Sequence, residues 1–439
     1  MSRIVIKHLG PINECDLELK RFMVLVGPQA SGKSTIAKGI FIFRSIGDTL
    51  IEIMLSRFST NGNGKSVLDH NDGKAESLCD RLKSEIRRNF TNSFGSIGRM
   101  SADMSVTYYY TDDVFVSLSL DFQKGVTEHI RIHMSEPVCE FLEEVEKKYY
   151  HPQELFSHRN DLVDEISAFF KVNTNNAYIP AGRSMVSLLS RQMSFILAKL
   201  TDEQKNTIDY CTRSFLERVM VLQSSYQNTL NRFLNNEIQL SPDNMETARD
   251  AMRLMVVLLG GRYVNETGLE FLKTQDGVYV DVMYASSGQQ EALWILNMLL
   301  YYLLIGETNS YIIEEPEAHL YPSAQKQMIE LIARIHNDPN NQTILTTHSP
   351  YVLGTINNLL FASTIEKKAD SGRLDEIIPK ENRISFEEVS AYYVDKGEAR
   401  SCLDEEQKEI NHDVIDGASR MINDAYDNML EIAYKEENT

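Results

Sequence analysis

The sequence predicts an α/β protein in which a parallel sheet carries an antiparallel lobe and helical insertions. Three observations indicate this fold class. An apolar run at 22–26 leads directly into a glycine-rich loop and then into a helical pattern. Strand-like and helical patterns alternate between 270 and 346, which is typical of parallel sheets. The segments 106–120 and 127–133 alternate apolar and polar side chains around Asp and Gly turns, as half-buried antiparallel strands do.

The composition is that of an ordinary globular protein. Of 439 residues, 42% are hydrophobic and 24% are charged, which excludes wholesale disorder and allows about three domains. The formal net charge is -19, so binding to DNA would need a local basic patch. The five cysteines form no CxxC pair, which predicts reduced thiols and no zinc site: Cys15, Cys79, Cys139, Cys211 and Cys402.

The sequence offers no pattern for export or for membrane insertion. The first residues, MSRIVIKHLG, lack the apolar core of a signal peptide. The longest charge-free apolar stretch, Ala292 to Ile305, is shorter than the roughly 18 residues that a membrane helix needs, and it contains Asn297. We therefore expect a cytoplasmic protein with no membrane partner, in which this stretch is a buried helix.

In chain order, we expect strands at 4–9 and 17–26, joined by the turn-forming Gly10-Pro11, and then a helix at 35–55. A segment dense in Ser, Asn, Gly and Asp at 59–73 marks a domain boundary. A hairpin is expected at 270–283. The predicted units are a core at 1–56 and 270–365, an antiparallel β and helical lobe at 57–177, a helical lobe at 178–269, and an acidic helical C-terminal extension at 366–439.

The C-terminal extension is predicted to be helical because apolar residues recur at helical spacing among acidic ones. They would form one stripe within 405–432: Ile410, Val414, Ile415, Ala418, Ile422 and Ala425. Such helices would dock a partner or a second copy, or they would cap the edge of the sheet.

The strongest motif is an eight-residue loop that matches GxxxxGK[ST] between an apolar strand and a helix. Its residues are Gly27, Pro28, Gln29, Ala30, Ser31, Gly32, Lys33 and Ser34, followed by Thr35. In such a P-loop, backbone N–H groups and the helix N-terminus bind phosphates. Lys33 would reach the β- and γ-phosphates, and the Ser34 hydroxyl would ligate Mg²⁺. The loop therefore predicts a site for ATP and Mg²⁺.

Two carboxylates, Glu314 and Glu315, follow the strand-like run 311–313, and ligands of open α/β sheets bind at such strand ends. Glu314 would hold Mg²⁺, directly or through water, and Glu315 would orient or deprotonate the attacking water. The alternative is a solvated acidic loop, which is the weaker interpretation because the P-loop is present.

A second anion-binding surface is expected where a long apolar helix begins. The residues before it are Ser286, Ser287, Gly288 and Gln289. Because one chain does not need two phosphate cradles for one nucleotide, we infer that this surface closes on the γ-phosphate held by another subunit. The simpler interpretation is an N-cap followed by Gly. His348, at the end of a later predicted strand at 342–346, is suited to contact the γ-phosphate or the attacking water.

With these motifs in this order, the sequence resembles an ABC-type ATPase head of the kind found in RecF, SMC and OLD-like ATPases, in the bacterial branch that reads EEPEAHLYP. Gly27 to Ser34 match Walker A, Ser286 to Gln289 the signature motif, Glu314 and Glu315 Walker B, Glu317 to Leu320 the D-loop, and His348 the switch histidine. The resemblance covers residues 1–35 and 178–362. It implies an ATPase that dimerises around ATP, with Lys33, Glu315 and His348 as catalytic residues.

Two positions depart from the transporter pattern: Glu314 replaces an Asp, and the signature reads SSGQ instead of SGGQ. Residues 178–183 resemble a PAxR segment of the same branch. Two roles stay open for Arg183: a phosphate or interface contact, and a surface salt bridge at a helix start. Gln192 is the candidate for the Q-loop glutamine.

SMC heads carry long heptad coiled coils, OLD nucleases append a Toprim domain, and transporters need membrane segments, and the sequence shows none of these patterns. It resembles instead the stand-alone ATPase of bacterial anti-phage modules (PARIS-like, Septu-like or RloA-like), which controls a separate nuclease or toxin. The alternative is a RecF-like DNA repair clamp. A third class is an ATP-gated scaffold with very slow hydrolysis.

The acidic charge favours the defence interpretation over the repair clamp. A basic cluster could contact nucleic acid, although a solvated helix face is the favoured explanation: Arg81, Lys83, Arg87 and Arg88. DNA is therefore not indicated as a partner.

Overall fold

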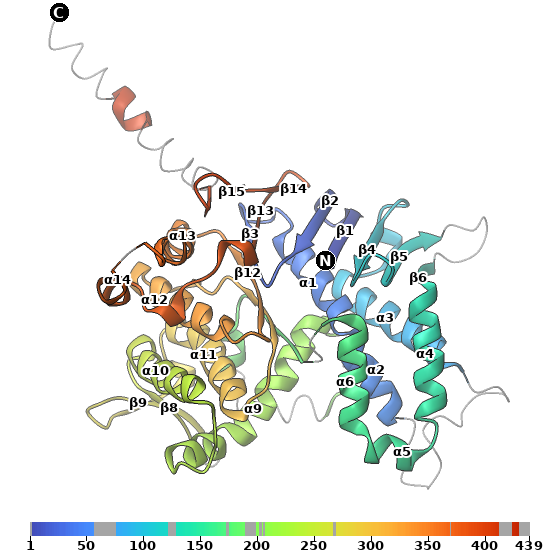
Figure 1. The fold of residues 1–439 in the computed structure, drawn as a ribbon, viewed down its shortest axis with the longest axis horizontal. Coiled ribbons are helices and arrows are strands. Elements are labelled where there is room, and N and C mark those ends of the chain that lie inside the picture. Colours follow the sequence, from blue (N-terminus) through green and yellow to red (C-terminus); the bar gives the residue numbers. More distant parts are fainter. Residues whose placement is uncertain are drawn as a thin grey trace, which may run out of the picture.

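The computed structural model describes residues 2–56, 76–121, 129–172, 175–188, 199–201, 204, 207–266, 269–368, 370–411 and 424–429. They form a mixed α/β fold around one eleven-stranded sheet (Figure 1). The strand order is β6-β5-β4-β1-β2-β14-β13-β3-β12-β11-β7. The α/β fold class predicted from the sequence is confirmed.

The first part of the chain supplies the antiparallel strands, the first strand of the parallel region and the helices beside them. Its elements are β1 (Ser2–Leu9), β2 (Ile12–Leu19), β3 (Phe22–Val26), α1 (Lys33–Arg44), α2 (Ile46–Ser56), α3 (Leu78–Phe94), β4 (Ser105–Tyr109), β5 (Phe115–Asp121), β6 (His129–Met134), α4 (Glu136–Lys148), α5 (Pro152–Ser157), α6 (Arg159–Phe170) and β7 (Asn176–Ile179).

The second part adds a helical layer, a small separate sheet and the remaining strands. Its elements are α9 (Tyr210–Leu234), α10 (Pro242–Leu259), β8 (Arg262–Glu266), β9 (Leu269–Lys273), β10 (Tyr279–Asp281), α11 (Ser287–Ile305), β11 (Ser310–Glu314), α12 (Pro322–His336), β12 (Gln342–Thr347), α13 (Pro350–Ile365), α14 (Ser371–Ile377), β13 (Val389–Asp395), β14 (Glu398–Ser401), β15 (Leu403–Asp404) and β16 (Glu409–Ile410).

The sheet has a parallel region and an antiparallel region. Neighbours within β13-β3-β12-β11-β7 run parallel, whereas neighbours within β6-β5-β4-β1-β2 run antiparallel. In the parallel region, Val26 pairs with Thr347, and Thr346 pairs with Glu314. The chain therefore leaves β3, β11 and β12 at the same edge, where α/β sheets bind ligands.

Two hydrophobic cores cover the two faces of the parallel region. Along β3, Phe22, Val24 and Val26 belong to one core, and the alternate residues Met23 and Leu25 belong to the other, as the two-residue period of a strand requires. The first core contains α9 to α13, and the second contains α1 to α4, α6 and the antiparallel strands (Figure 1). The two cores therefore hold elements that are distant in sequence around the sheet edge where β3, β11 and β12 end.

Several local predictions are confirmed. Antiparallel strands occur at β4, β5 and β6, and they extend the main sheet through β1. The hairpin is formed by β9 and β10. The apolar stretch from Ala292 lies in the largely buried helix α11. The helix expected at 35–55 is two helices, because α1 ends at Arg44 and α2 begins at Ile46. Within the described residues, no helix is both long and apolar enough to cross a membrane.

The prediction of a helical C-terminal extension is wrong for residues 389–410, which form β13 to β16. The strand β13 reads VSAYYVD, in which β-branched and aromatic residues favour strand, and it pairs with β3 beside the P-loop. Ile410 lies buried in β16. Ala425 lies in a short exposed helix at 424–429. The other residues of the predicted stripe, Val414, Ile415, Ala418 and Ile422, lie outside the described residues.

Candidate functional site

The P-loop joins β3 to α1 and is shaped by two glycines. Gly27 has φ 153° and Gly32 has φ 109°, and a Cβ on either would overlap a neighbour, the Val394 carbonyl oxygen or the Ile12 side chain. No side chain caps α1, so its first N–H groups are left for a ligand. Gly27, Ser31, Gly32 and Lys33 are buried, Thr35 is half-buried, and Pro28, Gln29, Ala30 and Ser34 are exposed.

Lys33 folds back over the loop that precedes it. Its Nζ donates to the carbonyl oxygens of Gly27 at 2.8 Å and Pro28 at 2.7 Å. Burial lowers the pKa of Lys33, while the carboxylates of Glu315 and Glu314 act in the opposite direction. The ammonium group therefore lies between the loop and the acidic end of β11.

Glu314 is the last residue of β11, and its side chain is buried. Its Oε2 accepts from the N–H of Ala181 at 3.1 Å. Its Oε1 is buried and has no hydrogen-bond partner among the described residues. A buried carboxylate oxygen without a donor is costly unless a cation or another donor joins it, so this atom fits a Mg²⁺ ligand.

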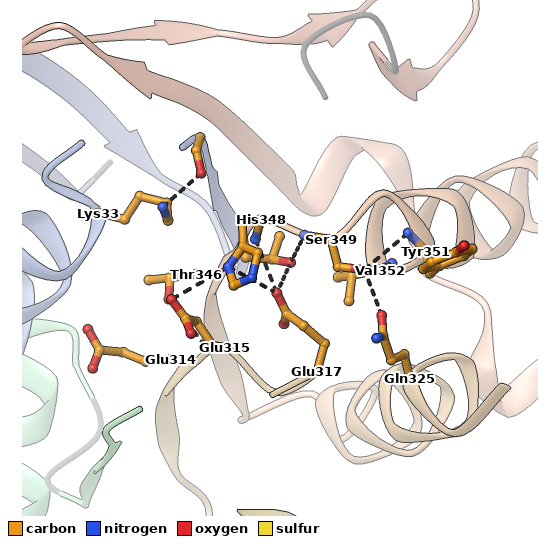
Figure 2. Close-up of polar contacts among 12 residues, drawn as sticks. Lys33, Glu314, Glu315, Glu317, Gln325, Thr346, His348, Ser349, Tyr351 and Val352 are labelled. Carbon is orange, nitrogen blue, oxygen red and sulfur yellow. Dashed lines mark hydrogen bonds and ion pairs between the residues drawn. The ribbon is translucent and has the colours of Figure 1, made fainter. Parts of the chain in front are cut away.

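Glu315 and His348 meet where β11 and β12 end (Figure 2). The N–H of Glu315 donates to the carbonyl oxygen of Thr346 at 2.9 Å, and the residue has φ 44°. His348 Nδ1 lies 3.5 Å from Glu315 Oε1. This contact raises the pKa of His348 and lowers the pKa of Glu315. The Glu315 carboxylate is therefore ionised at neutral pH.

Glu317 anchors Thr347 and the predicted switch histidine, His348. Its buried carboxylate accepts from Thr347 Oγ1 at 2.6 Å and from the N–H of His348 at 3.1 Å. Burial raises the pKa of Glu317. The sequence placed Glu317 in the D-loop but did not predict that it fixes His348; only its position two residues after Glu315 pointed to it.

The signature residues lie at the N-terminus of α11. Ser286 and Gln289 form a capping box, in which Gln289 N donates to Ser286 Oγ at 3.4 Å and Ser286 N donates to Gln289 Oε1 at 2.8 Å. Ser286 and Ser287 are exposed, and a Cβ on Gly288 would lie 2.6 Å from the His319 carbonyl oxygen. Among the described residues, no hydrogen bond or ion pair joins the signature to the P-loop.

Two other features, Arg183 and a cavity, border the site. Arg183 is buried and bonds to the backbone of both Walker B glutamates, so it is not a surface salt bridge. Gln192 lies outside the described residues. A cavity of about 630 Å³ is lined by His8, Gly10 and Ile12 among others, and Gly10 adjoins Thr35 of the P-loop helix. The cavity is thus open beside the phosphate-binding loop.

A glycine-rich loop between a parallel strand and a helix, with acidic residues at the end of a neighbouring strand, defines a P-loop ATPase. The AAA ATPase domain matches residues 1–353 of the chain. The chain therefore belongs to this ATPase family, and membership implies that it uses a nucleotide.

No curated protein matches the chain in sequence. Among solved structures, the chain is similar to three SMC head domains. An Smc head bound to the C-terminal winged-helix domain of ScpA is 12% identical, with 91% of this chain and 96% of that chain covered and a TM-score of 0.41. A Pyrococcus furiosus Smc head with an extended coiled coil bound to ScpA is also 12% identical, with the same coverage and a TM-score of 0.39. The Thermotoga maritima SMC head is 10% identical, with 80% and 90% covered and a TM-score of 0.33.

Proposed function

We propose that the protein hydrolyses ATP with Mg²⁺ and that two copies close around the nucleotide. The proposal rests on one observation: the chain has two separate surfaces that are suited to bind phosphate. The P-loop, Walker B and His348 gather at one sheet edge, whereas the signature is an exposed helix N-terminus with its own cap. A second copy would bring its signature to the phosphates held by the first.

The chain's own residues fit this chemistry. The P-loop N–H groups and Lys33 would bind the phosphates, and the cavity beside the loop would receive the base. Ser34 and Glu314 would hold Mg²⁺, which supplies positive charge that offsets the phosphate oxygens. The ionised Glu315 carboxylate would orient the attacking water and accept its proton, while His348 keeps that carboxylate in place.

Exposed aromatic side chains support an interface on the signature side. Tyr284, just before the signature, is 79% exposed, and Tyr321, just after the D-loop, is 78% exposed. The contact of Gly288 with the His319 carbonyl brings these two segments together. Tyrosine is enriched in protein interfaces, so this face is suited to bind a second copy.

Glu315→Gln tests the proposal. The variant should hydrolyse ATP at least about 100-fold more slowly and should form a stable dimer with ATP and Mg²⁺, because the nucleotide is bound but not consumed. Light scattering after size exclusion measures the dimer. Glu154→Gln, at an exposed position on α5, is the control. An unchanged hydrolysis rate would remove Glu315 from catalysis.

The finer role that the sequence supports best is the regulatory ATPase of an anti-phage system that controls a separate nuclease or toxin. A groove of about 510 Å³ between α9, α10 and β8 supports a protein partner. Its lining includes Met245, Met252 and Met255, and its charged side chains, among the residues that the structure describes, are Arg249, Arg253 and Arg262. On a chain of net charge -19, these arginines favour an acidic amphipathic helix of the effector.

Mass spectrometry of proteins that co-purify with the native chain in ATP and Mg²⁺ tests this role. A stoichiometric nuclease-like or toxin-like partner is expected, and Arg253→Glu with Val257→Asp in the groove should release it. Recovery of DNA and recombination proteins without such a partner would favour the RecF-like repair clamp instead.

The described residues do not favour that alternative. The basic cluster lies on α3, where Arg87 Nε donates to the Ile130 carbonyl oxygen at 3.1 Å and Arg88 pairs with Glu85. Of the four basic residues, only Arg88 is exposed. The cluster therefore does not offer a free basic surface, and DNA is not proposed as a partner.

A further inference from the structure

Arg183 lies behind the Walker B glutamates and holds their backbone. Its Nη1 donates to the carbonyl oxygen of Glu314 at 2.6 Å, and its Nη2 donates to that of Glu315 at 3.0 Å. The side chain is fully buried. A forked guanidinium that binds two successive carbonyls fixes the orientation of the peptide between them. At Glu315, where φ is 44°, that orientation sets the direction of the carboxylate.

The same arginine is tied to the signature helix. Its Nε lies 3.2 Å from Glu291 Oε2 and donates to the Glu291 carbonyl oxygen at 3.1 Å. The Glu291 carboxylate also accepts from the N–H groups of Arg183 and Ser184, both at 3.1 Å. Both partners are at most 2% exposed as side chains. Among the described residues, each hydrogen bond and ion pair of this carboxylate therefore goes to the segment that holds Walker B.

A buried ion pair adds little to the free energy of unfolding, because the cost of removing two charges from water is about as large as the energy of their attraction. What the pair does provide is a rigid link with one geometry. Glu291 stands four residues after Ser287, which is about one turn and about 6 Å along α11. A displacement at the start of the helix therefore reaches Glu291 directly.

We propose that Arg183 and Glu291 form a positioning pair that transmits phosphate binding at the signature to the Walker B glutamate of the same chain. The inference rests on the proposed function, in which the phosphate comes from a second copy. When that phosphate seats against Ser287, α11 shifts with Glu291, and Arg183 then resets the backbone at Glu315. Hydrolysis is thereby delayed until the dimer has closed.

Glu291→Gln tests the pair with little change in volume. We expect kcat for ATP to fall at least about tenfold, while KM and the dissociation constant of ATP stay within about twofold. Combined with Glu315→Gln, it should leave the ATP-dependent dimer intact. The matched control is Glu270→Gln, because Glu270 is equally buried and accepts from Tyr263 but has no contact with Walker B. That control should leave kcat unchanged.

A fall in kcat no larger than that of Glu270→Gln, or a parallel rise in KM, would show that the pair is only structural and would overturn the inference. If Glu291→Gln does not fold, Arg183→Lys gives the same test, since it keeps the charge but loses the fork, and an unchanged kcat would overturn the inference. Failure of the proposed function is visible separately, because the unmodified protein would then neither dimerise with ATP nor hydrolyse it.

Discussion

The protein has two surfaces suited to bind phosphate, and they differ in how they are completed. The P-loop is surrounded by its own chain: Gly27 touches the strand β13, Lys33 is buried, and Glu314 and Glu315 lie at the end of β11, two strands away from β3. The signature at the start of α11 is exposed and is satisfied by its own capping box. One chain surrounds its P-loop with its own residues, whereas it leaves the signature open to a ligand from outside that chain.

The difference separates binding from activation. In the proposed function, nucleotide binding depends on the P-loop edge of one chain, whereas the signature contributes only when a second copy supplies the phosphate. The two surfaces are nevertheless mechanically connected, because α11 reaches Walker B through Glu291 and Arg183. Variants at each surface should therefore fail in different ways, and these failures can be measured.

The largest effect is expected for Lys33→Ala at the P-loop. Removing the ammonium that we propose binds the phosphates should weaken ATP binding at least about 100-fold, because a charge-assisted contact from within the loop is lost. Lys38→Ala is the matched control on the same helix, where the lysine pairs with Asp209 at 3.1 Å. Titration with a fluorescent ATP analogue measures both. Tight binding by Lys33→Ala would refute the P-loop assignment.

The second prediction concerns the signature and its link to the P-loop edge. Ser287→Arg should still bind ATP but should not hydrolyse it, since the added cation and volume block the signature. Mixed with Lys33→Ala, it should regain no hydrolysis, although one composite site of the mixed dimer is intact, because the chain with the working P-loop carries the blocked signature and its Glu315 is not reset through Glu291 and Arg183. Initial phosphate release measures the mixture. Recovery above either variant alone would show that the composite site works without the link inside one chain, and would contradict the positioning pair.

The sequence was sufficient for the P-loop, the acidic strand end and His348, because each is a local motif on a strand of one parallel sheet. It was insufficient for links between distant segments: Arg183 and Glu291 are 108 residues apart, and no local spacing joins them. It also mistook β13 for part of a helical region. The acidic composition of the C-terminal segment suggested helix more strongly than the short run VSAYYVD suggested strand. That run forms a strand because it pairs with β3, which local sequence does not reveal.

The third prediction tests how tightly the P-loop is enclosed. In Gly27→Ala, the new methyl group would overlap the Val394 carbonyl oxygen at φ 153°, so the variant should lose about 1–3 kcal/mol of unfolding free energy. In Gly39→Ala, the methyl group meets Ile4 at an ordinary 3.5 Å within α1, so stability should hold or rise by up to about 1 kcal/mol. Denaturant titration measures both. Equal losses would mean that β13 does not constrain the loop.

The smallest effect is expected in the titration of His348. Because the adjacent Glu315 carboxylate raises the pKa of His348, Glu315→Gln should lower that pKa toward its ordinary value of about 6.5. The pair stabilises the fold below the unfolded pKa of the histidine, and its contribution is lost as the pH rises through the folded pKa. The contribution should be small, because the side chains of His348 and Glu315 are 39% and 31% exposed.

Histidine NMR measures this pKa directly, and Ser287→Arg provides the contrast. Without nucleotide, that variant should leave the pKa of His348 unchanged, because the signature then has no phosphate to transmit. A fall in the pKa of His348 as large as that in Glu315→Gln would mean that the signature already influences His348 in the free chain. Closure of the dimer would then adjust an existing contact instead of creating one.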